Sequence, residues 1–258
     1  MSAPDESETV TPPTEDMQPI GGAIVQLGRR RSWVRGVLEL ARSAALVIMF
    51  FFLVRSVLIE AFKIPTSSME ETLLAGDFLL VNKAAYGAEI PGLGLSLPAL
   101  SEPDRGDIIV FHPPHEPDKH YVKRLVGLPG DLLQMRDKSL FVNGEKILEP
   151  YVRYLDPDGD AVHPSMSWQA PYLRDRDAPG RYRPSRDNWG PLVVPPERFF
   201  VLGDNRDNSE DSRYWGFIMR EAIEGRPWVV YYSSEPQEAD GLSPFSEVRW
   251  DRIGGLVR

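Results

Sequence analysis

Three hydroxyl side chains stand in a row at Thr66, Ser67 and Ser68, directly after Pro65. A hydroxyl can attack a carbonyl group when a neighbouring group takes its proton, and a second hydroxyl can donate to the oxyanion that forms. The same residues also suit a helix N-cap, because each serine precedes a glutamate by three positions, as in a capping box. Taken alone, the segment favours the cap and leaves open whether one hydroxyl is also a nucleophile.

A partner for such a hydroxyl occurs at Lys123, within the alternating stretch 121–126. In a strand, Lys123 shares one face with Tyr121 and Leu125, while Arg124 points the other way. Burial lowers the pKa of a lysine from about 10.4, and a neutral amine can act as a general base. The pattern alone is more typical of a solvated lysine at a sheet edge, so both interpretations stay open.

A third polar segment, residues 203–216, follows the apolar run 199–202. Its alternating acidic residues are reminiscent of a calcium-binding loop. However, the sixth position counted from Asp204 is not glycine, and the twelfth is Trp215 rather than glutamate. The segment instead predicts a dense loop whose Asp–Arg pairs and hydroxyls brace neighbouring side chains.

Other kinds of site find less support. His112, His115 and His120 surround a Pro-Pro pair, where solvated side chains are favoured over a zinc site, and His163 stands apart. The absence of cysteine excludes a disulfide framework, a thiolate metal site and a cysteine nucleophile. The sequence contains no Gly-x-Ser-x-Gly elbow, Walker loop or Rossmann glycine motif. We therefore expect neither a cofactor nor a catalytic metal.

The chain has 258 residues, enough for one large domain or two small ones. Its 29 basic and 38 acidic residues give a net charge of −9, which gives no support to a nucleic-acid partner. Residues 1–32 predict a disordered, acidic and proline-rich tail that ends in a basic cluster.

Residues 43–54, with the sequence SAALVIMFFFLV, carry no charge. Alone they are short enough for a buried core helix, but residues 37–59 reach the length of a membrane span if Arg42 and Arg55 snorkel to opposite interfaces. A buried amphipathic helix and a cleaved signal peptide are the alternatives. We predict a single transmembrane helix over 37–59, with the tail cytoplasmic and residues 61–258 outside, because the basic cluster precedes the helix.

The remainder predicts a mainly β fold built on antiparallel sheet. Short apolar or alternating runs, bounded by turn residues, occur at 78–81, 107–111, 121–126, 139–142, 199–202 and 228–232. Asn143-Gly144 predicts a hairpin, and only residues 220–224 and the stretch after Ser68 look briefly helical. The Pro- and aromatic-rich part at about 145–196 predicts an inserted subdomain of irregular β structure.

Together these segments resemble bacterial type I signal peptidases, the membrane-anchored Ser/Lys proteases that remove signal peptides from exported proteins. Four blocks carry the resemblance in the family's order, at residues 65–73, 105–111, 123–131 and 203–213. The resemblance implies an antiparallel-sheet catalytic domain behind one N-terminal transmembrane helix. It also implies a single-pass protein of the bacterial cytoplasmic membrane, a monomer near the translocation machinery, whose partners are signal peptides and the lipid bilayer.

The resemblance further implies roles for individual residues. Ser68 would be the nucleophile and Lys123 the general base, while Thr66 and the Ser68 backbone N–H would form the oxyanion hole. Ser209 would orient the lysine amine. Asp211 and Arg213 would brace the Ser68–Lys123 pair. The pockets for small substrate residues would be lined by Phe62, Ile64, Met69, Tyr121 and Val122.

Two departures from the family pattern lie beside the nucleophile. Thr66-Ser67 replaces the commoner Ser-Gly, and Glu71 replaces a usual proline. We expect Glu71 to face solvent, because a buried carboxylate would favour a protonated, inactive Lys123.

Three further interpretations stay open. Leucines of residues 90–100, at positions 93, 95, 97 and 100, either dip into the membrane interface or belong to an ordinary covering loop. The enzyme could also be a related Ser/Lys protease with another substrate, such as a pilin maturase or a self-cleaving repressor. An inactive membrane-tethered binding module on the same fold is the third.

Overall fold

The computed structural model describes residues 21–87, 89–90, 95–96, 98–156, 160–175, 182–235 and 247–258. It separates into two units, one ending at Phe52 and the other comprising Leu53–Arg258.

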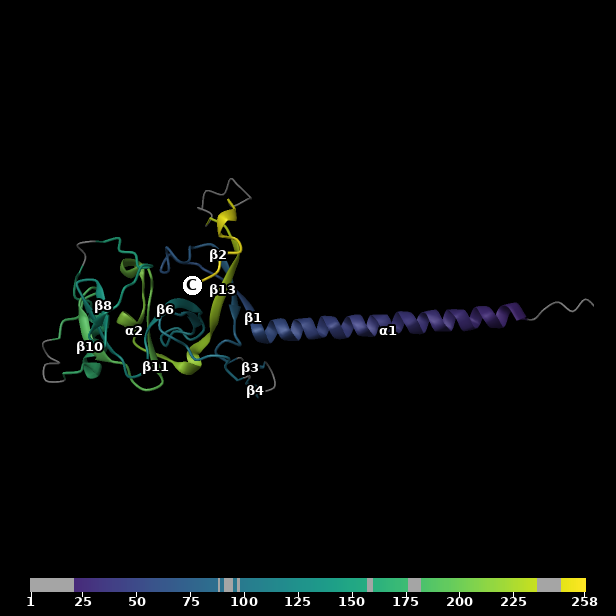
Figure 1. Ribbon diagram of the computed structural model, residues 1–258, viewed down its shortest axis with the longest axis horizontal. Coiled ribbons are helices and arrows are strands. Elements are labelled where there is room, and N and C mark those ends of the chain that lie inside the picture. The colour runs from purple at the N-terminus through teal and green to yellow at the C-terminus, as the bar shows by residue number, and fades with distance from the viewer. Residues whose placement is uncertain are drawn as a thin grey trace, which may run out of the picture. The chain divides into compact units, whose positions relative to one another are not determined.

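The helix α1 spans Gly21–Leu58, and its residues up to Phe52 belong to the first unit (Figure 1). Residues 1–20 of the predicted disordered tail lie outside the described residues, but residues 21–32 are helical instead, since no proline interrupts the chain between Pro19 and Pro65. The helix ends at Leu58, one residue before the predicted end of the transmembrane segment, because Ile59 pairs with Asn82 in a sheet.

The helix α1 contains all but the last residue of the segment predicted to span the membrane. Within the part of the chain that the structure describes, no helix combines the length and the apolar character needed to cross a bilayer. The seven consecutive apolar side chains of residues 46–52 are all exposed.

The second unit is organised around a seven-stranded antiparallel sheet in the order β1-β2-β13-β5-β6-β11-β12. The strands are β1 Ile59–Lys63, β2 Asp77–Asn82, β13 Ile223–Ser233, β5 Ile108–Phe111, β6 Tyr121–Gly127, β11 Arg198–Leu202 and β12 Ile218–Met219. This architecture confirms the prediction of a mainly β, antiparallel fold.

The side chains of β5 alternate between two apolar clusters. Ile109 and Phe111 pack into one cluster together with Leu125, whereas Ile108 and Val110 pack into the other. Ile109 lies opposite Lys123 in the neighbouring strand β6, so the lysine extends from the face that also carries Leu125. The alternation predicted for residues 121–126 is therefore present.

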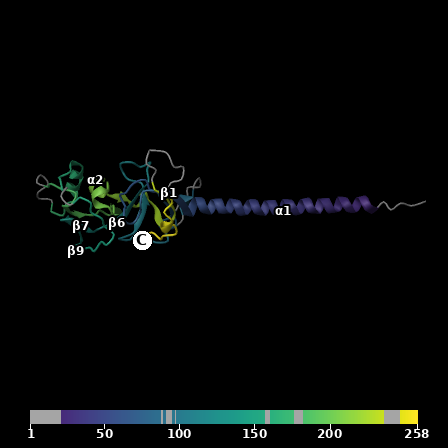
Figure 2. The ribbon, with the colours of Figure 1, turned by 90° about the horizontal axis from the view of Figure 1, so that it is seen from above.

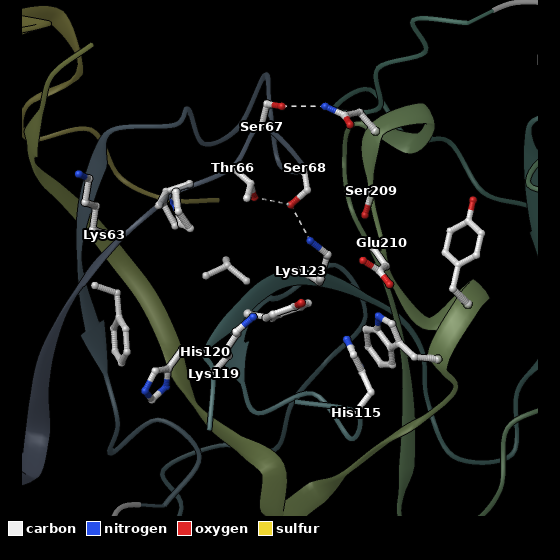
Figure 3. Close-up of a pocket in the computed structure, with 18 of the residues that line it drawn as sticks. Lys63, Thr66, Ser67, Ser68, His115, Lys119, His120, Lys123, Ser209 and Glu210 are labelled. Atoms are coloured by element: carbon white, nitrogen blue, oxygen red, sulfur yellow. Dashed lines mark hydrogen bonds between the residues drawn. The ribbon is translucent and has the colours of Figure 1, made fainter. Parts of the chain in front are cut away.

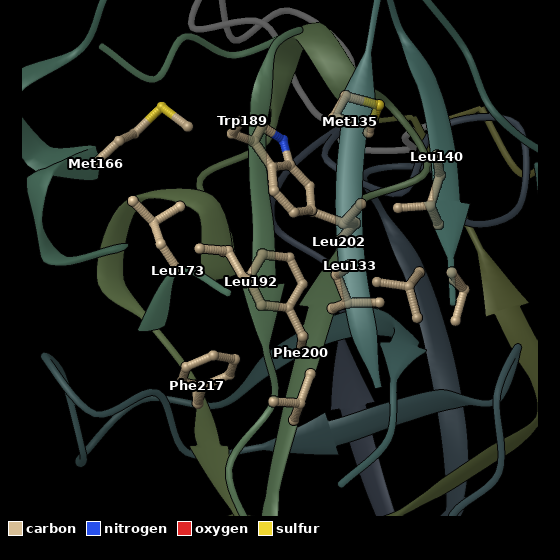
Figure 4. Packing of buried hydrophobic residues seen from close by; sticks show 13 residues of the cluster. Leu133, Met135, Leu140, Met166, Leu173, Trp189, Leu192, Phe200, Leu202 and Phe217 are labelled. Carbon is tan, nitrogen blue, oxygen red and sulfur yellow. The ribbon is translucent and has the colours of Figure 1, made fainter. Parts of the chain in front are cut away.

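A second, four-stranded antiparallel sheet has the order β10-β7-β8-β9. Its strands are β10 Trp189–Val193, β7 Leu132–Arg136, β8 Ser139–Val142 and β9 Glu145–Lys146. It lies beside the larger sheet in both views (Figures 1 and 2), and their shared core includes Trp189 and Phe200, with ring centroids 5.2 Å apart (Figure 4). The second sheet begins at Leu132, earlier than the boundary near 145 that we predicted for an insertion.

The predicted hairpin at Asn143-Gly144 is confirmed, because both residues have positive φ angles, 55° and 89°, and they join β8 to β9. The helical turn expected at residues 220–224 is a 3-10 turn at Arg220–Ala222, after which β13 begins. The stretch directly after Ser68, which was expected to be briefly helical, forms turns at residues 69–72 instead.

The apolar loop 90–100 is described only in part. Glu89–Ile90 (β3) pairs with Leu95–Ser96 (β4), and Leu100 is exposed. The leucines at positions 93 and 97 lie outside the described residues. Short elements complete the fold: η1 Pro164–Tyr172, η3 Arg206–Asn208, α2 Ser212–Trp215 and η5 Trp250–Arg252.

Candidate active site

A cavity of about 1200 Å³ opens between the turn at residues 64–68, strand β6 and the loop at residues 207–210. Four of the five predicted pocket residues line it: Phe62, Ile64, Tyr121 and Val122. The fifth, Met69, does not. It is 1% exposed and packs in an apolar cluster with Leu73 and Leu79, so it lies behind the lining of the cavity, and its contact with substrate stays a prediction.

Ser68 and Lys123 meet at the floor of this cavity (Figure 3). The Lys123 Nζ donates to Ser68 Oγ at 2.5 Å, across 55 positions of sequence. Only 4% of Lys123 and 9% of Ser68 are exposed. A nucleophile and a base are thus in hydrogen-bonding contact, shielded from bulk water.

The pKa of Lys123 is lowered to about 8, chiefly because the side chain is buried and also because of the positive charge of Arg213. The negative charges of Asp211, Asp204 and Glu210 act in the opposite direction and raise it. The balance leaves a substantial neutral fraction of the amine at mildly alkaline pH. A neutral amine has the lone pair that a general base needs.

Thr66 supplies a second hydroxyl at the same place. Its Oγ1 lies 3.4 Å from Ser68 Oγ, and either oxygen can be the donor (Figure 3). This position suits a donor to an oxyanion that forms as Ser68 attacks.

The loop that follows β11 holds the turn of the nucleophile in place. The Asn205 backbone N–H donates to the Ser68 carbonyl oxygen at 3.1 Å. The Asn205 side-chain amide donates to the Ser67 carbonyl oxygen at 3.2 Å, and the Asn208 amide donates to Ser67 Oγ at 2.8 Å. Asn205 and Asn208 were not predicted as site residues, although both stand in the polar segment 203–216.

Asp211, further along the same polar segment, is fully buried and accepts hydrogen bonds from several donors. Arg213 contacts it through Nε and Nη2, each at 2.8 Å, and the Gly203 backbone N–H donates at 3.0 Å. Burial alone would raise the pKa of Asp211, but the charge and hydrogen bonds of Arg213 hold it below its usual range. Asp211 and Arg213 therefore lie behind the cavity wall as a bonded pair.

Ser209 lines the cavity but makes a different contact from the one expected. Its hydroxyl donates to Asp211 Oδ2 at 2.8 Å, rather than contacting the Lys123 amine. The buried carboxylate is the stronger acceptor, since a hydrogen bond to a charged group is stronger than one between neutral groups.

Arg124, on the opposite face of β6, forms a second buried pair. Its Nε and Nη2 donate to the two carboxylate oxygens of Asp204 at 2.8 and 2.7 Å. The hydroxyl of Thr72 donates to the same carboxylate at 2.5 Å. Since Asp204 follows Gly203 and precedes Asn205, this pair ties β6 to the loop that holds Ser68.

Glu71 faces solvent, as we expected, and its carboxylate pairs with Arg153 at 3.3 Å. Its φ angle is 86°, which proline cannot adopt. The chain therefore takes a path at this position that a proline would not allow.

The histidines are not all part of a solvated loop. His115 stacks on Trp215 with ring centroids 5.6 Å apart. His112 and His120 face each other and contact Glu224, a residue that was expected only at the end of a short helical stretch.

Comparison with known proteins gives consistent matches. The profile of the family described as signal peptidase, peptidase S26, matches residues 37–232. The chain is 37% identical over 227 residues to signal peptidase I of Pseudomonas fluorescens, covering 82% of this chain and 78% of that protein. It is 33% identical over 243 residues to signal peptidase I of Aquifex aeolicus, covering 79% and 89%. A crystal structure of signal peptidase I from Enterococcus faecalis matches at 30% identity, covering 50% of this chain and 98% of that one with a TM-score of 0.34.

Proposed function

The chain belongs to the signal peptidase family S26, and from that membership and the geometry of the cavity we propose that it is a serine endopeptidase that removes signal peptides from exported preproteins by Ser/Lys chemistry. The single observation that carries the chemical part is the 2.5 Å contact between Lys123 Nζ and Ser68 Oγ in a buried setting.

In the proposed first step, the neutral Lys123 amine takes the proton of Ser68 Oγ while this oxygen bonds to the scissile carbonyl carbon. The carbonyl π pair moves to oxygen, where the Thr66 hydroxyl and the Ser68 backbone N–H donate to it. Collapse of this intermediate breaks the peptide bond, and the protonated Lys123 gives its proton to the departing amine. An ester to Ser68 remains.

In the second step, Lys123 takes a proton from a water molecule that attacks the ester carbonyl. The resulting intermediate releases the acid, and Ser68 Oγ recovers the proton from Lys123. The hydrogen bonds of Asn205 to the turn around Ser68 keep the nucleophile in position through both steps. We assign Ser209, Asp211 and Arg213 to support of this arrangement, since the three residues bond to one another.

The substrate contacts are proposed from the lining of the cavity. Ile64, Tyr121 and Val122 surround its floor together with Phe62, and such apolar side chains suit small residues before the cleaved bond. The peptide would lie extended beside these segments. Its backbone hydrogen bonds would then provide affinity, and the pockets would provide specificity for small side chains.

We also propose that the enzyme works at the bilayer of the bacterial cytoplasmic membrane, held there by residues 37–59 as a single span with the N-terminus cytoplasmic. The support is the uncharged sequence 43–54, the exposed apolar side chains of residues 46–52, and the arginines at 29–31 and 35 on the N-terminal side. Extraction of cell membranes at alkaline pH tests this point, because a spanning protein stays in the pellet whereas a peripheral one is released.

The activity is tested by incubating the purified full chain in detergent with a preprotein and sequencing the N-terminus of the product. We expect one cut after a small residue at the end of the signal peptide, and no cut with Ser68→Ala. Cleavage of a pilin precursor but not of a secretory preprotein would favour a maturation protease instead. No cleavage of either would favour a binding module.

A further inference from the structure

Three side chains with metal-binding atoms meet at one end of the large sheet. His112 directly follows β5, His120 directly precedes β6, and Glu224 lies near the start of β13. The strand register places them together, because Phe111 pairs with Tyr121 on one side and with Ile223 on the other. This trio is distinct from the Ser68–Lys123 pair.

The atoms that could bind a metal ion converge. One ligand atom from each residue lies within 4.8 Å of the other two. The His120 Nδ1 is 2.7 Å from one carboxylate oxygen of Glu224, and the His112 Nε2 is 3.5 Å from the other. About a third of each histidine side chain is exposed, so an ion can reach the trio from solvent.

The backbone already orients one of the ligands. The His112 Nδ1 lies 3.1 Å from the Lys119 carbonyl oxygen, which can only accept a hydrogen bond, so this nitrogen carries the proton. The lone pair of His112 is then on Nε2, the atom that faces Glu224. A histidine that ligates a metal through one nitrogen and donates from the other to a carbonyl is the usual arrangement in metal sites.

We propose that His112, His120 and Glu224 form a binding site for a divalent transition-metal ion of the zinc type. Two imidazoles and one carboxylate are a ligand set that suits zinc, whereas calcium and magnesium prefer oxygen alone. Bonds of about 2.0–2.1 Å to a tetrahedral ion place ligand atoms about 3.3 Å apart. The ligand atoms of the trio already lie within 4.8 Å of one another, so small side-chain rotations bring them to this spacing. His120 can bind the ion through Nδ1 when its ring proton is on Nε2. Water would take the fourth coordination position of the ion.

The site is placed at the rim of the cavity, since His120 lines the cavity and its ring contacts Phe62 with centroids 4.9 Å apart. The ion would play no part in the proton transfers of Ser68 and Lys123. Binding of the metal is therefore independent of the proposed peptidase activity and is measured without substrate.

The test uses the full chain in detergent, without a polyhistidine tag and with isotope-labelled histidines. The protein has only four histidines, so each ring gives its own NMR signal. On addition of Zn²⁺ we expect the signals of His112 and His120 to shift, while those of His115 and His163 stay. Uniform small shifts of all four, or shifts of His115 and His163 alone, would overturn the proposal.

Calorimetry with Zn²⁺ adds a measurement of affinity. We expect the double variant His112→Ala/His120→Ala and the single variant Glu224→Gln to weaken binding by about 100-fold or more, since loss of an outer partner alone costs roughly 10–100-fold. The matched control His115→Ala/His163→Ala should bind as the unaltered chain does. Equal affinity in all variants, or no Zn²⁺ binding by the unaltered chain, would contradict the site. Circular dichroism checks that each variant is folded.

Discussion

Gly203 and Ser209 approach so closely that a Cβ atom on Gly203 would lie 2.2 Å from Ser209 Oγ. The same atom would lie 2.5 Å from the carbonyl oxygen of Ser68. Contacts this short do not occur between unbonded atoms, and the carbonyl oxygen is part of the backbone. The absence of a side chain at position 203 is therefore what lets the loop after β11 reach the nucleophile.

We expect Gly203→Ala to push the loop away from Ser68 and to remove most of the preprotein cleavage. Overpacking of this kind costs roughly 1–3 kcal/mol in the free energy of unfolding. Cleavage assays and denaturant unfolding measure the two effects. The control is Gly36→Ala, where, apart from the chain neighbours and the backbone of its own helix, no atom lies within 4 Å of the added Cβ. Full activity in Gly203→Ala would show that the loop does not need this close approach.

The pair formed by Arg124 and Asp204 should matter for stability. Both side chains are buried, so Asp204→Ala leaves a guanidinium without its partner, at a cost of about 3–5 kcal/mol in the free energy of unfolding. Urea titration of the two proteins measures this loss. A matched control is Glu102→Ala, which removes an exposed partner of Arg220 and should leave the midpoint unchanged. Equal midpoints for the Asp204 variant and the unaltered chain would contradict the assignment.

The hydroxyl of Thr66 should contribute to the rate and not to binding of the substrate. Thr66→Val keeps the shape of the side chain and removes the donor, and loss of one oxyanion donor typically lowers kcat by about 10²–10³. Thr66→Ser keeps the hydroxyl, so its kcat should stay within about tenfold of that of the unaltered chain. Steady-state cleavage kinetics separate kcat from KM. An unchanged kcat in Thr66→Val would remove Thr66 from the oxyanion hole.

The pH dependence follows from the buried amine. The active form of Lys123 is neutral and its pKa is about 8, so kcat/KM should rise with pH and level off above about pH 8. The negative charge of Glu210 raises this pKa, and Glu210→Gln should therefore move the profile to lower pH. Rate profiles of the two proteins on one preprotein measure the shift. A shift to higher pH in Glu210→Gln would contradict the electrostatic argument.

Local patterns in the sequence predicted much of the sheet. Strand β8 begins and ends where it was expected, and the Asn143-Gly144 turn has the positive φ angles that the residue pair favours. Strands β7 and β10 were not predicted, because Gln134 and Pro191 interrupt their apolar character. Pairing with neighbouring strands stabilises them instead.

The site was harder to predict than the strands. Alternation correctly placed Lys123 on the face of Leu125, but its burial depends on the turn around Ser68, 55 positions away. The burial of Met69 behind the cavity lining was likewise not visible in the sequence, because standing next to a nucleophile does not decide which way a side chain points. The contact of His120 with Glu224 spans 104 positions, and no local pattern indicates it.

The central claim is that Lys123 works as a neutral base, and Lys123→Arg tests it most directly. Arginine keeps the positive charge and much of the length but cannot lose its proton in a protein. Preprotein cleavage by this variant, measured in detergent with sequencing of the product, should fall by about 10²–10⁴-fold, the usual contribution of a general base. Cleavage within tenfold of the unaltered chain would show that Ser68 does not depend on a neutral amine at position 123.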